Sequence, residues 1–394
     1  MDLRAIGGCR LRPCWLQNNQ FRLEEERYVM RRIWQAEEGM TLIELMVAMV
    51  VSLAVVGAAL ALLVTSNNAI QVNQQATDTQ QNVRLAMDLI SQDIKLAGFN
   101  MSNVVVPGCV VGLLATPAPI VPLDNVPAGA VGVINDVGPD AVNLLVPSMV
   151  AGNGGGVPVL SALASGGNTI PLSALDIGAM VTSGLVLGSV VSVGGNFSSS
   201  VTAIGAAFLT LARGLPVAAQ FPAGTPVYLL QCVAYTVSAN PAICAGSTSC
   251  LLRNGVPMVD GIEDLQLAYG CDGCNVLAPN PGGPDGVIDD QDNPGPLPVG
   301  AGVFSAGDFI TNNNWATLPM TPDKIRLVQI TIVARDSQAS KGLSEGNALP
   351  THAAAPVIVS DHNPAVDATY NAPVYNQQRR RVLTKTVQVR NLES

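Results

Sequence analysis

The feature that most constrains this chain is an uninterrupted apolar run over residues 40–64. These 25 consecutive residues contain no Lys, Arg, Asp or Asn, and Glu44 is their only ionisable side chain. About 20 apolar residues are enough for a helix to cross a bilayer. Because a carboxylate is costly inside such a segment, an intramembrane acid indicates a functional role.

The residues at the start of this run, from Gly39 through Met40 and Glu44 to Ala48, resemble the class III signal of type IV prepilins. In that family a prepilin peptidase cleaves after the glycine, the new amine is N-methylated, and the acid five residues on is needed for assembly. The resemblance implies that Gly39 ends the leader, Met40 begins the mature chain and Glu44 is the assembly carboxylate. The chain departs from the family at Met40, where Phe is usual.

An ordinary signal anchor and a secretory signal with a lengthened apolar region are the alternatives. A secretory signal has an apolar core of about 7 to 15 residues, followed by its cleavage site. Here the run is longer and the cleavage motif precedes it, so the prepilin interpretation is favoured.

Residues 1–29 show no hydrophobic period. A translation start at Met30 would give a short leader with the basic residues that keep an N-terminus cytoplasmic.

A helix is predicted to continue beyond the apolar run, so that one helix of about 87 Å covers residues 40–97. Its second half is amphipathic, because apolar residues recur there at intervals of three and four. Gly98 would end the helix as the C′ residue, with Lys95 in the last turn. The predicted apolar stripe consists of Ala69, Val72, Ala76, Val83, Met87, Ile90, Ile94 and Ala97.

The rest of the chain is predicted to be rich in β-strands. Between residues 100 and 224 it is dominated by Gly, Val and Ala, and the runs 141–146 and 179–193 predict strands between turns. Clearer strands are expected at 227–237, 265–269, 325–334 and 382–389, which are enriched in β-branched or aromatic residues. A meander of these four strands on the helix stripe would give an α+β fold.

Three further stretches resemble PilW-type minor pilins. They are the helix end at residues 88–99, which finishes in Ala-Gly-Phe, and the segments 259–270 and 380–392. The resemblance implies a type IV pilin-like fold, in which the long N-terminal helix packs on an antiparallel sheet within a large, loop-rich β domain. The expected parts are a leader at 1–39, a transmembrane or filament-core helix at 40–64, an amphipathic half at 65–98 and a periplasmic or extracellular domain at 99–394.

The resemblance also implies a function. The protein would be a minor pilin that helps to initiate or assemble type IV pili, with a location near the tip and a role in adhesion or uptake. Its partners would be prepilin peptidase and other minor and major pilins. It would lie in the inner membrane before assembly and at the pilus or cell surface afterwards.

Two other functional classes share the leader. A J-type pseudopilin of type II secretion has the same signal and helix, and gene neighbourhood separates the two. A membrane-anchored binding module or enzyme is the more distant alternative. We expect no enzyme, because no nucleophile motif such as G-x-S-x-G accompanies the acidic residues.

The charge and the cysteines indicate the compartment. Removing seven Arg and six acids with the leader leaves 13 basic and 23 acidic residues, a net charge near −10. Such a charge disfavours nucleic-acid binding, and the only basic cluster is residues 379–381.

The even cysteine count points to disulfides in an oxidising compartment. The six mature cysteines are Cys109, Cys232, Cys244, Cys250, Cys271 and Cys274.

Spacing favours Cys244 with Cys250 and Cys271 with Cys274, which would leave Cys109 to meet Cys232. The alternative is that the Cys271 pair forms a redox motif, or a zinc site with the Cys244 pair. A thioredoxin-type motif belongs between a strand and a helix, however, whereas these cysteines follow a strand and enter a loop. Disulfides are therefore the preferred interpretation.

The remaining candidates for chemistry are an acidic loop and two histidines. The loop at residues 285–293 concentrates hard oxygen ligands that suit Ca²⁺, although its spacing does not fit an EF-hand and a solvated loop is the favoured alternative. Its candidate ligands are Asp285, Asp289, Asp290 and Asp292. His352 and His362 are expected to be exposed polar residues. No other cofactor is expected.

Overall fold

The computed structural model divides the chain into two compact units, residues 1–70 and 71–394. In the first unit it describes residues 41–70. In the second it describes residues 71–99, 109–111, 116–123, 137–148, 156–216, 221–244, 249–274, 288, 308–311, 315, 321–336, 356–367, 370–375 and 378–389.

The predicted long helix is confirmed as α2, Leu42–Leu96. It ends as expected, because Gly98 adopts a positive φ of 75° and the Phe99 N–H donates to the Leu96 carbonyl at 3.0 Å. Of the predicted stripe, Ala69 is exposed and Val72 and Ala76 are only half-buried. The rest of the stripe is buried, and it consists of Val83, Met87, Ile90, Ile94 and Ala97.

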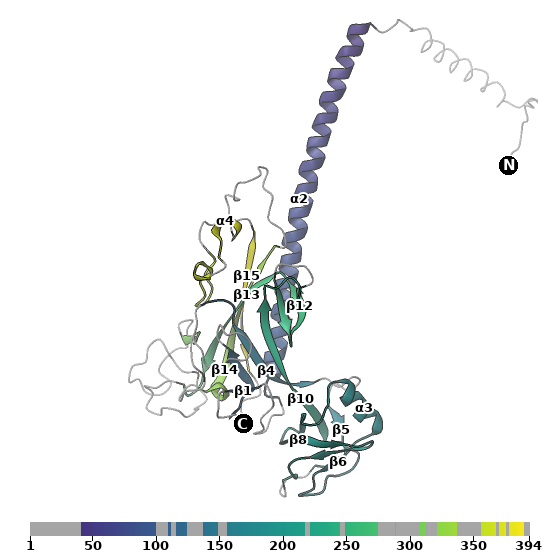
Figure 1. Cartoon of the computed structure of the whole chain (residues 1–394), viewed down its shortest axis with the longest axis vertical. Coiled ribbons are helices and arrows are strands. Elements are labelled where there is room, and N and C mark those ends of the chain that lie inside the picture. Colours follow the sequence, from purple (N-terminus) through teal and green to yellow (C-terminus); the bar gives the residue numbers. More distant parts are fainter. Residues whose placement is uncertain are drawn as a thin grey trace, which may run out of the picture. The chain divides into compact units, whose positions relative to one another are not determined.

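Three of the predicted strands form an antiparallel sheet in the order β13-β14-β15. They are β13 (Ile262–Cys271), β14 (Ile325–Arg335) and β15 (Arg380–Gln388), shown side by side in Figure 1. Leu267 and Ile330 pair across the first two strands, and both belong to the buried core that contains the α2 stripe. The helix and the antiparallel strands confirm the predicted α+β class.

The fourth predicted strand, β10 (Pro226–Ser238), belongs to a different sheet, so the single four-stranded meander was wrong. β10 pairs with β4 on one side, where Cys232 lies opposite Leu145, and with β7 and β11 on the other. Its Val233 and Tyr235 still face the core shared with α2, whereas Val227 and Leu229 enter a second core. The strand therefore links the two cores.

The ten-stranded sheet that contains β10 follows the order β12-β11-β10-β7-β8-β9-β6, with β3, β4 and β5 attached through β10 and β4. Its other strands are β3 (Ile120–Leu123), β4 (Ala141–Ser148), β5 (Val157–Pro158), β6 (Thr169–Pro171), β7 (Val190–Val193), β8 (Phe197–Ile204), β9 (Phe208–Leu211), β11 (Cys250–Arg253) and β12 (Val256–Asp260). A separate short pair joins β1 (Val110–Val111) to β2 (Thr116–Pro117). Short helical turns occur at η2 (Pro322–Lys324), η3 (Pro364–Val366) and α4 (Ala372–Tyr375).

The second core lies within residues 157–229 and includes a helix that the sequence analysis missed. The run 179–193 was predicted as strand, but its first residues belong to α3 (Ala174–Thr182). Ser173 caps this helix: its hydroxyl accepts the Asp176 N–H at 3.1 Å and donates to the Asp176 carboxylate at 2.6 Å. This reciprocal cap and the burial of Ile177 and Met180 override the strand propensity of the run.

Polar contacts and disulfides tie these layers together. Asp93 of α2 accepts the Tyr235 hydroxyl at 2.6 Å and the Arg253 Nε–H at 2.9 Å, which anchors the helix to β10 and β11. The disulfides of the structure are Cys109–Cys232, Cys244–Cys250 and Cys271–Cys274, the pairing that the spacing favoured.

Candidate functional site

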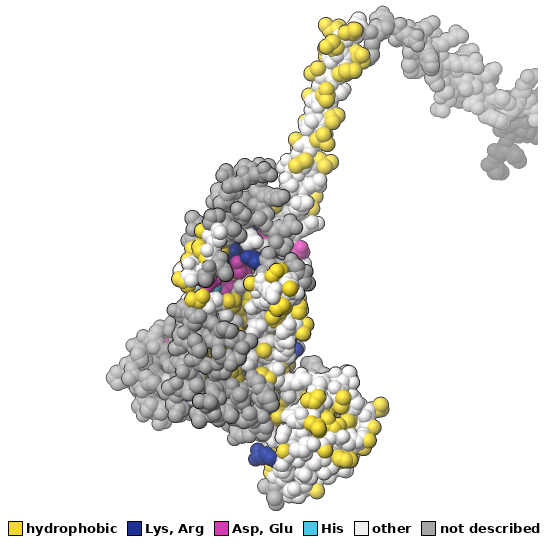
Figure 2. Space-filling model, in the orientation of Figure 1, with side chains coloured by type: hydrophobic (Ala, Val, Ile, Leu, Met, Phe, Trp, Pro, Cys, Tyr) yellow, Lys and Arg dark blue, Asp and Glu magenta, His cyan; other side chains and the backbone are white. Residues whose placement is uncertain are grey.

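The first half of α2 presents an almost unbroken apolar surface. Residues 42–64 are exposed throughout, and Figure 2 shows hydrophobic side chains along this part of the helix. The helix is long and apolar enough to cross a membrane, and its most apolar window has a mean hydropathy of 2.8 with none of it buried. Gly39 and Met40 lie outside the described residues. A surface of this kind needs lipid or other apolar helices around it.

Glu44 lies in the first turn of this helix and caps it. Its carboxylate accepts the Thr41 N–H and the Thr41 hydroxyl, both at 3.0 Å, while the Glu44 N–H points at the Thr41 hydroxyl oxygen at 3.3 Å. This is a capping box, whose Thr-x-x-Glu spacing is visible in the sequence and was not used in the sequence analysis. Within a single chain the acid therefore stabilises the start of its own helix.

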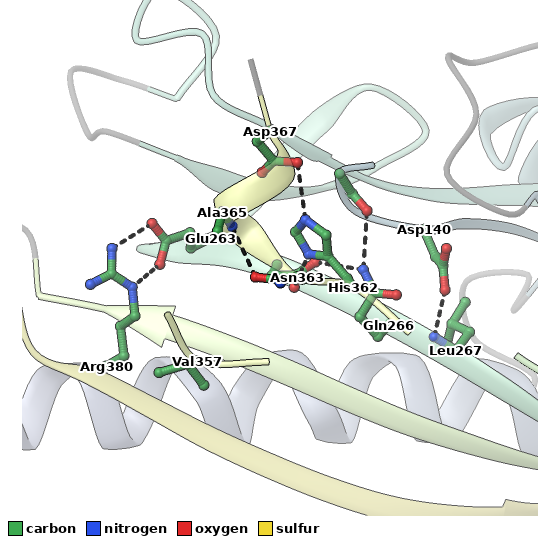
Figure 3. A network of polar contacts seen from close by, with 12 residues as sticks. Asp140, Glu263, Gln266, Leu267, Val357, His362, Asn363, Ala365, Asp367 and Arg380 are labelled. Atoms are coloured by element: carbon green, nitrogen blue, oxygen red, sulfur yellow. Dashed lines mark hydrogen bonds and ion pairs between the residues drawn. The ribbon is translucent and has the colours of Figure 1, made fainter. Parts of the chain in front are cut away.

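A second concentration of polar groups lies in the globular unit, where Figure 3 shows His362 with its ring directed toward Asp367. His362 Nδ1 lies 2.8 Å from Asp264 Oδ2, and Nε2 lies 3.1 Å from Asp367 Oδ1. The expectation that this histidine is exposed was wrong, since its side chain is 3% exposed. A bridge between Val359 and His362 folds the segment back on itself, which carries the ring to β13. His352 lies outside the described residues.

The protonation state of His362 follows from this position. Burial by itself favours the neutral ring, but hydrogen bonds and charge from Asp264 and Asp367 outweigh it and raise the pKa to about 9. The imidazole is therefore cationic at neutral pH. It neutralises Asp264, which is held on its other oxygen by the Gln266 side chain at 2.9 Å.

An arginine cluster adjoins the histidine. Arg380 donates through Nε and Nη2 to both oxygens of Glu263, and through Nη1 to the Tyr375 carbonyl at 2.6 Å. Its guanidinium also lies 3.2 Å from the centre of the Tyr375 ring. Arg335 Nη1 reaches the same glutamate at 3.3 Å. Arg380, the middle residue of the basic cluster, therefore lies in an internal ion pair with Glu263.

The predicted calcium ligands cannot be placed. Asp285, Asp289, Asp290 and Asp292 lie outside the described residues, so the calcium hypothesis stays a prediction. Among the residues that are described, no three His, Cys, Asp or Glu side chains come together as a metal site.

Comparisons with known protein families give matches in two parts of the chain. A family model for the prokaryotic N-terminal methylation motif matches residues 34–60, and one for type IV pilus-assembly protein W matches residues 232–391. A comparison with curated protein sequences finds no significant match. The methylation motif covers the leader junction and the apolar start of α2. The other match covers most of β10 and all of β11 to β15, which form the sheet layers around the helix. The chain is therefore a type IV pilus-associated pilin, with a PilW-type region over residues 232–391.

Proposed function

We propose that this protein is a minor pilin that helps to initiate and assemble type IV pili. The observation that carries the proposal is the exposed apolar half of α2, with Glu44 as its single acid, in a chain that continues into a PilW domain. Residues 40–64 would anchor the precursor in the inner membrane with the globular unit in the periplasm. They would then pack among the helices of other pilins in the filament. The PilW match favours the pilus over the type II secretion alternative.

Residues 156–229 are the part of the proposed subunit suited to a role beyond assembly. This region lies wholly before the PilW match and has its own buried core. The helix layer and the β13-β14-β15 sheet do not need it, since they share the other core. A location near the pilus tip, where this region would meet surfaces or cargo, is part of the proposal.

Cleavage after Gly39 is the first prediction. We expect the protein isolated from pili to begin at Met40, because prepilin peptidase cuts at the boundary between leader and apolar helix. Intact-mass and N-terminal peptide measurements give the start directly, and they also show whether the amine is methylated. Gly39→Ala should be processed better than Gly39→Leu. A protein in sheared pili that still carries residues before Gly39 would disprove the assignment.

The second prediction concerns Glu44. After cleavage the α-amine of Met40 would be largely cationic at neutral pH, and an apolar helix bundle penalises an unpaired ammonium and an unpaired carboxylate alike. Pairing Glu44 with the Met40 amine of a neighbouring subunit would remove both penalties and set the register between helices. We expect Glu44→Ala and Glu44→Gln to leave insertion and cleavage intact and to reduce the protein in sheared pili at least tenfold.

Thr41→Val is the matched control for this experiment. It removes the hydroxyl of the capping box and keeps the carboxylate of Glu44. If Glu44 acts in assembly, Thr41→Val pili contain near wild-type amounts of the protein. If both variants are lost from pili to the same degree, helix capping explains the effect and the assembly role is wrong. Wild-type incorporation of Glu44→Ala would contradict it as well.

A further inference from the structure

The two polar clusters of the globular unit line one cavity of about 170 Å³. Its walls come mainly from the first residues of β13, the last residues of β14, the start of β15 and the segments 356–367 and 370–375. Figure 3 shows Glu263 and Arg380 on one side and His362 with Asp367 on the other. Residues distant in the sequence thus converge on one concave site.

The charges around this cavity cancel. Arg335, Arg380 and the protonated His362 provide three positive charges, and Glu263, Asp264 and Asp367 provide three negative ones. Each of these groups already has an opposite partner in the wall. A charged ligand would have to break one of these pairs and leave a buried charge unpaired, which is strongly unfavourable. The cavity therefore selects against ions.

The volume and the lining of the cavity further limit the kinds of ligand that can bind. A cavity of about 150 Å³ holds benzene in an engineered protein, so 170 Å³ encloses one ring of that size, and the exocyclic groups of a pyranose would lie in the open mouth of the cavity. Part of the lining is apolar, with Val333, Val357 and the rings of Tyr370 and Tyr375, whose centres are 5.3 Å apart. The cavity thus combines apolar walls and aromatic rings with a polar rim.

The rim offers hydrogen bonds to hydroxyl groups. The side chains of Glu263 and Asp367 are 23% and 24% exposed and can accept further O–H donors. The Tyr375 hydroxyl accepts the Val357 N–H at 3.0 Å, and its own O–H is a hydrogen-bond donor as well. A saturated ring with an apolar C–H face and hydroxyls on its edge matches both kinds of wall.

We propose that this cavity binds one neutral pyranose ring, as a free sugar or as the terminal unit of a glycan. Tyr370 would contact the C–H face of the ring, and Asp367 and Glu263 would accept its hydroxyls. Because the cavity lies on the globular unit, binding does not require assembly into a pilus, and the proposal stands apart from the role of Glu44.

The test uses the full mature protein in a zwitterionic detergent, since detergents with sugar head groups would compete. The probes are the methyl glycosides of glucose, galactose and mannose, with glucuronate and glucosamine as charged counterparts. Saturation-transfer NMR with titration should show at least one neutral glycoside binding with a dissociation constant of about 1 mM. Both charged sugars should bind at least tenfold more weakly. No neutral glycoside binding at roughly ten times that concentration would overturn the proposal, as would equal binding of glucuronate or glucosamine.

Variants test whether the sugar binds in this cavity. Tyr370→Ala removes a ring whose side chain makes none of the ion pairs, and it should weaken binding at least tenfold. Phe208→Ala removes a partly exposed ring from β9, a strand of the other core, and should leave binding unchanged. Asp367→Asn keeps an acceptor for His362 and should weaken binding less than Tyr370→Ala does. If Tyr370→Ala and Asp367→Asn, both folded by near-ultraviolet circular dichroism, bind as wild type, the cavity is not the site.

Discussion

Removing the Cys109–Cys232 disulfide is expected to lower the free energy of unfolding by about 5 kcal/mol. The bridge closes a loop with a sequence separation of 123 residues, whereas the Cys244–Cys250 bridge spans six. Because the entropy lost by the unfolded chain grows with the length of the closed loop, the long bridge contributes most. It also holds the residues before β3 against the middle of β10.

The measurement compares Cys109→Ser/Cys232→Ser with Cys244→Ser/Cys250→Ser, which closes a small loop and should cost only about 2 kcal/mol. Trp315 is buried against Tyr269 with ring centres 5.3 Å apart, and it is the only tryptophan after residue 39. Its fluorescence during denaturant unfolding of the mature protein measures the free energy of unfolding of both variants in the same way. Equal losses would show that loop length does not govern the stabilisation. Alkylation of the denatured, non-reduced protein should find no free thiol among its six cysteines.

Raising the pH should destabilise the globular unit through His362. Its pKa is about 9 in the folded protein, against an ordinary value of 6.5 for histidine, so the stabilisation is fully present below pH 6.5 and is lost as pH rises through 9. At 1.36 kcal/mol per pKa unit, the loss is at most about 3 kcal/mol. The groups facing the ring are Asp264 from β13 and Asp367 beyond η3, with Glu263, Arg335 and Arg380 farther along the same cavity.

His362→Gln isolates this contribution. The variant keeps a side-chain donor for Asp264 but cannot become cationic, so it should be less stable than wild type near pH 6.5 and should approach it at pH 9.5. Lys385→Gln is the control, because its ion pair with Asp88 is 3.6 Å long and both partners are exposed. It should cost less than about 1 kcal/mol. A difference between His362→Gln and wild type that stays constant from pH 6.5 to 9.5 would contradict the ion-pair account.

Sequence pattern by itself determined the elements whose signals are local and repeated. The apolar run and the three-and-four stripe predicted α2 to within two residues at either end, and Gly98 ends it because a C′ residue with positive φ favours glycine. The runs of β-branched residues predicted β13, β14 and β15. The side chains of each strand either alternate between more buried and more exposed positions or are mostly buried, as expected for strands in a two-layer fold. The residue types and spacing at the prepilin junction also predicted the methylation motif that matches residues 34–60.

Only the tertiary structure decided how these elements meet. Residues 227–237 read as a strand in isolation, but strand pairing across long separations, to β4 and β7, places β10 in the second sheet. The run 179–193 carries strand propensity, and burial of Ile177 and Met180 with the Ser173 cap makes its beginning helical.

The ion pairs of the globular unit also could not be predicted from the sequence. His362 has no flanking ligand motif, and its partner Asp264 lies 98 residues away. Arg380 reads as part of a basic cluster, yet its partner Glu263 lies 117 residues away. Hydrophobic periods are local and can be read along a chain, whereas an ion pair depends on two side chains that only folding brings within a few ångströms. For that reason the helix and the prepilin signal could be predicted from the sequence, whereas the cavity could be found only from the fold.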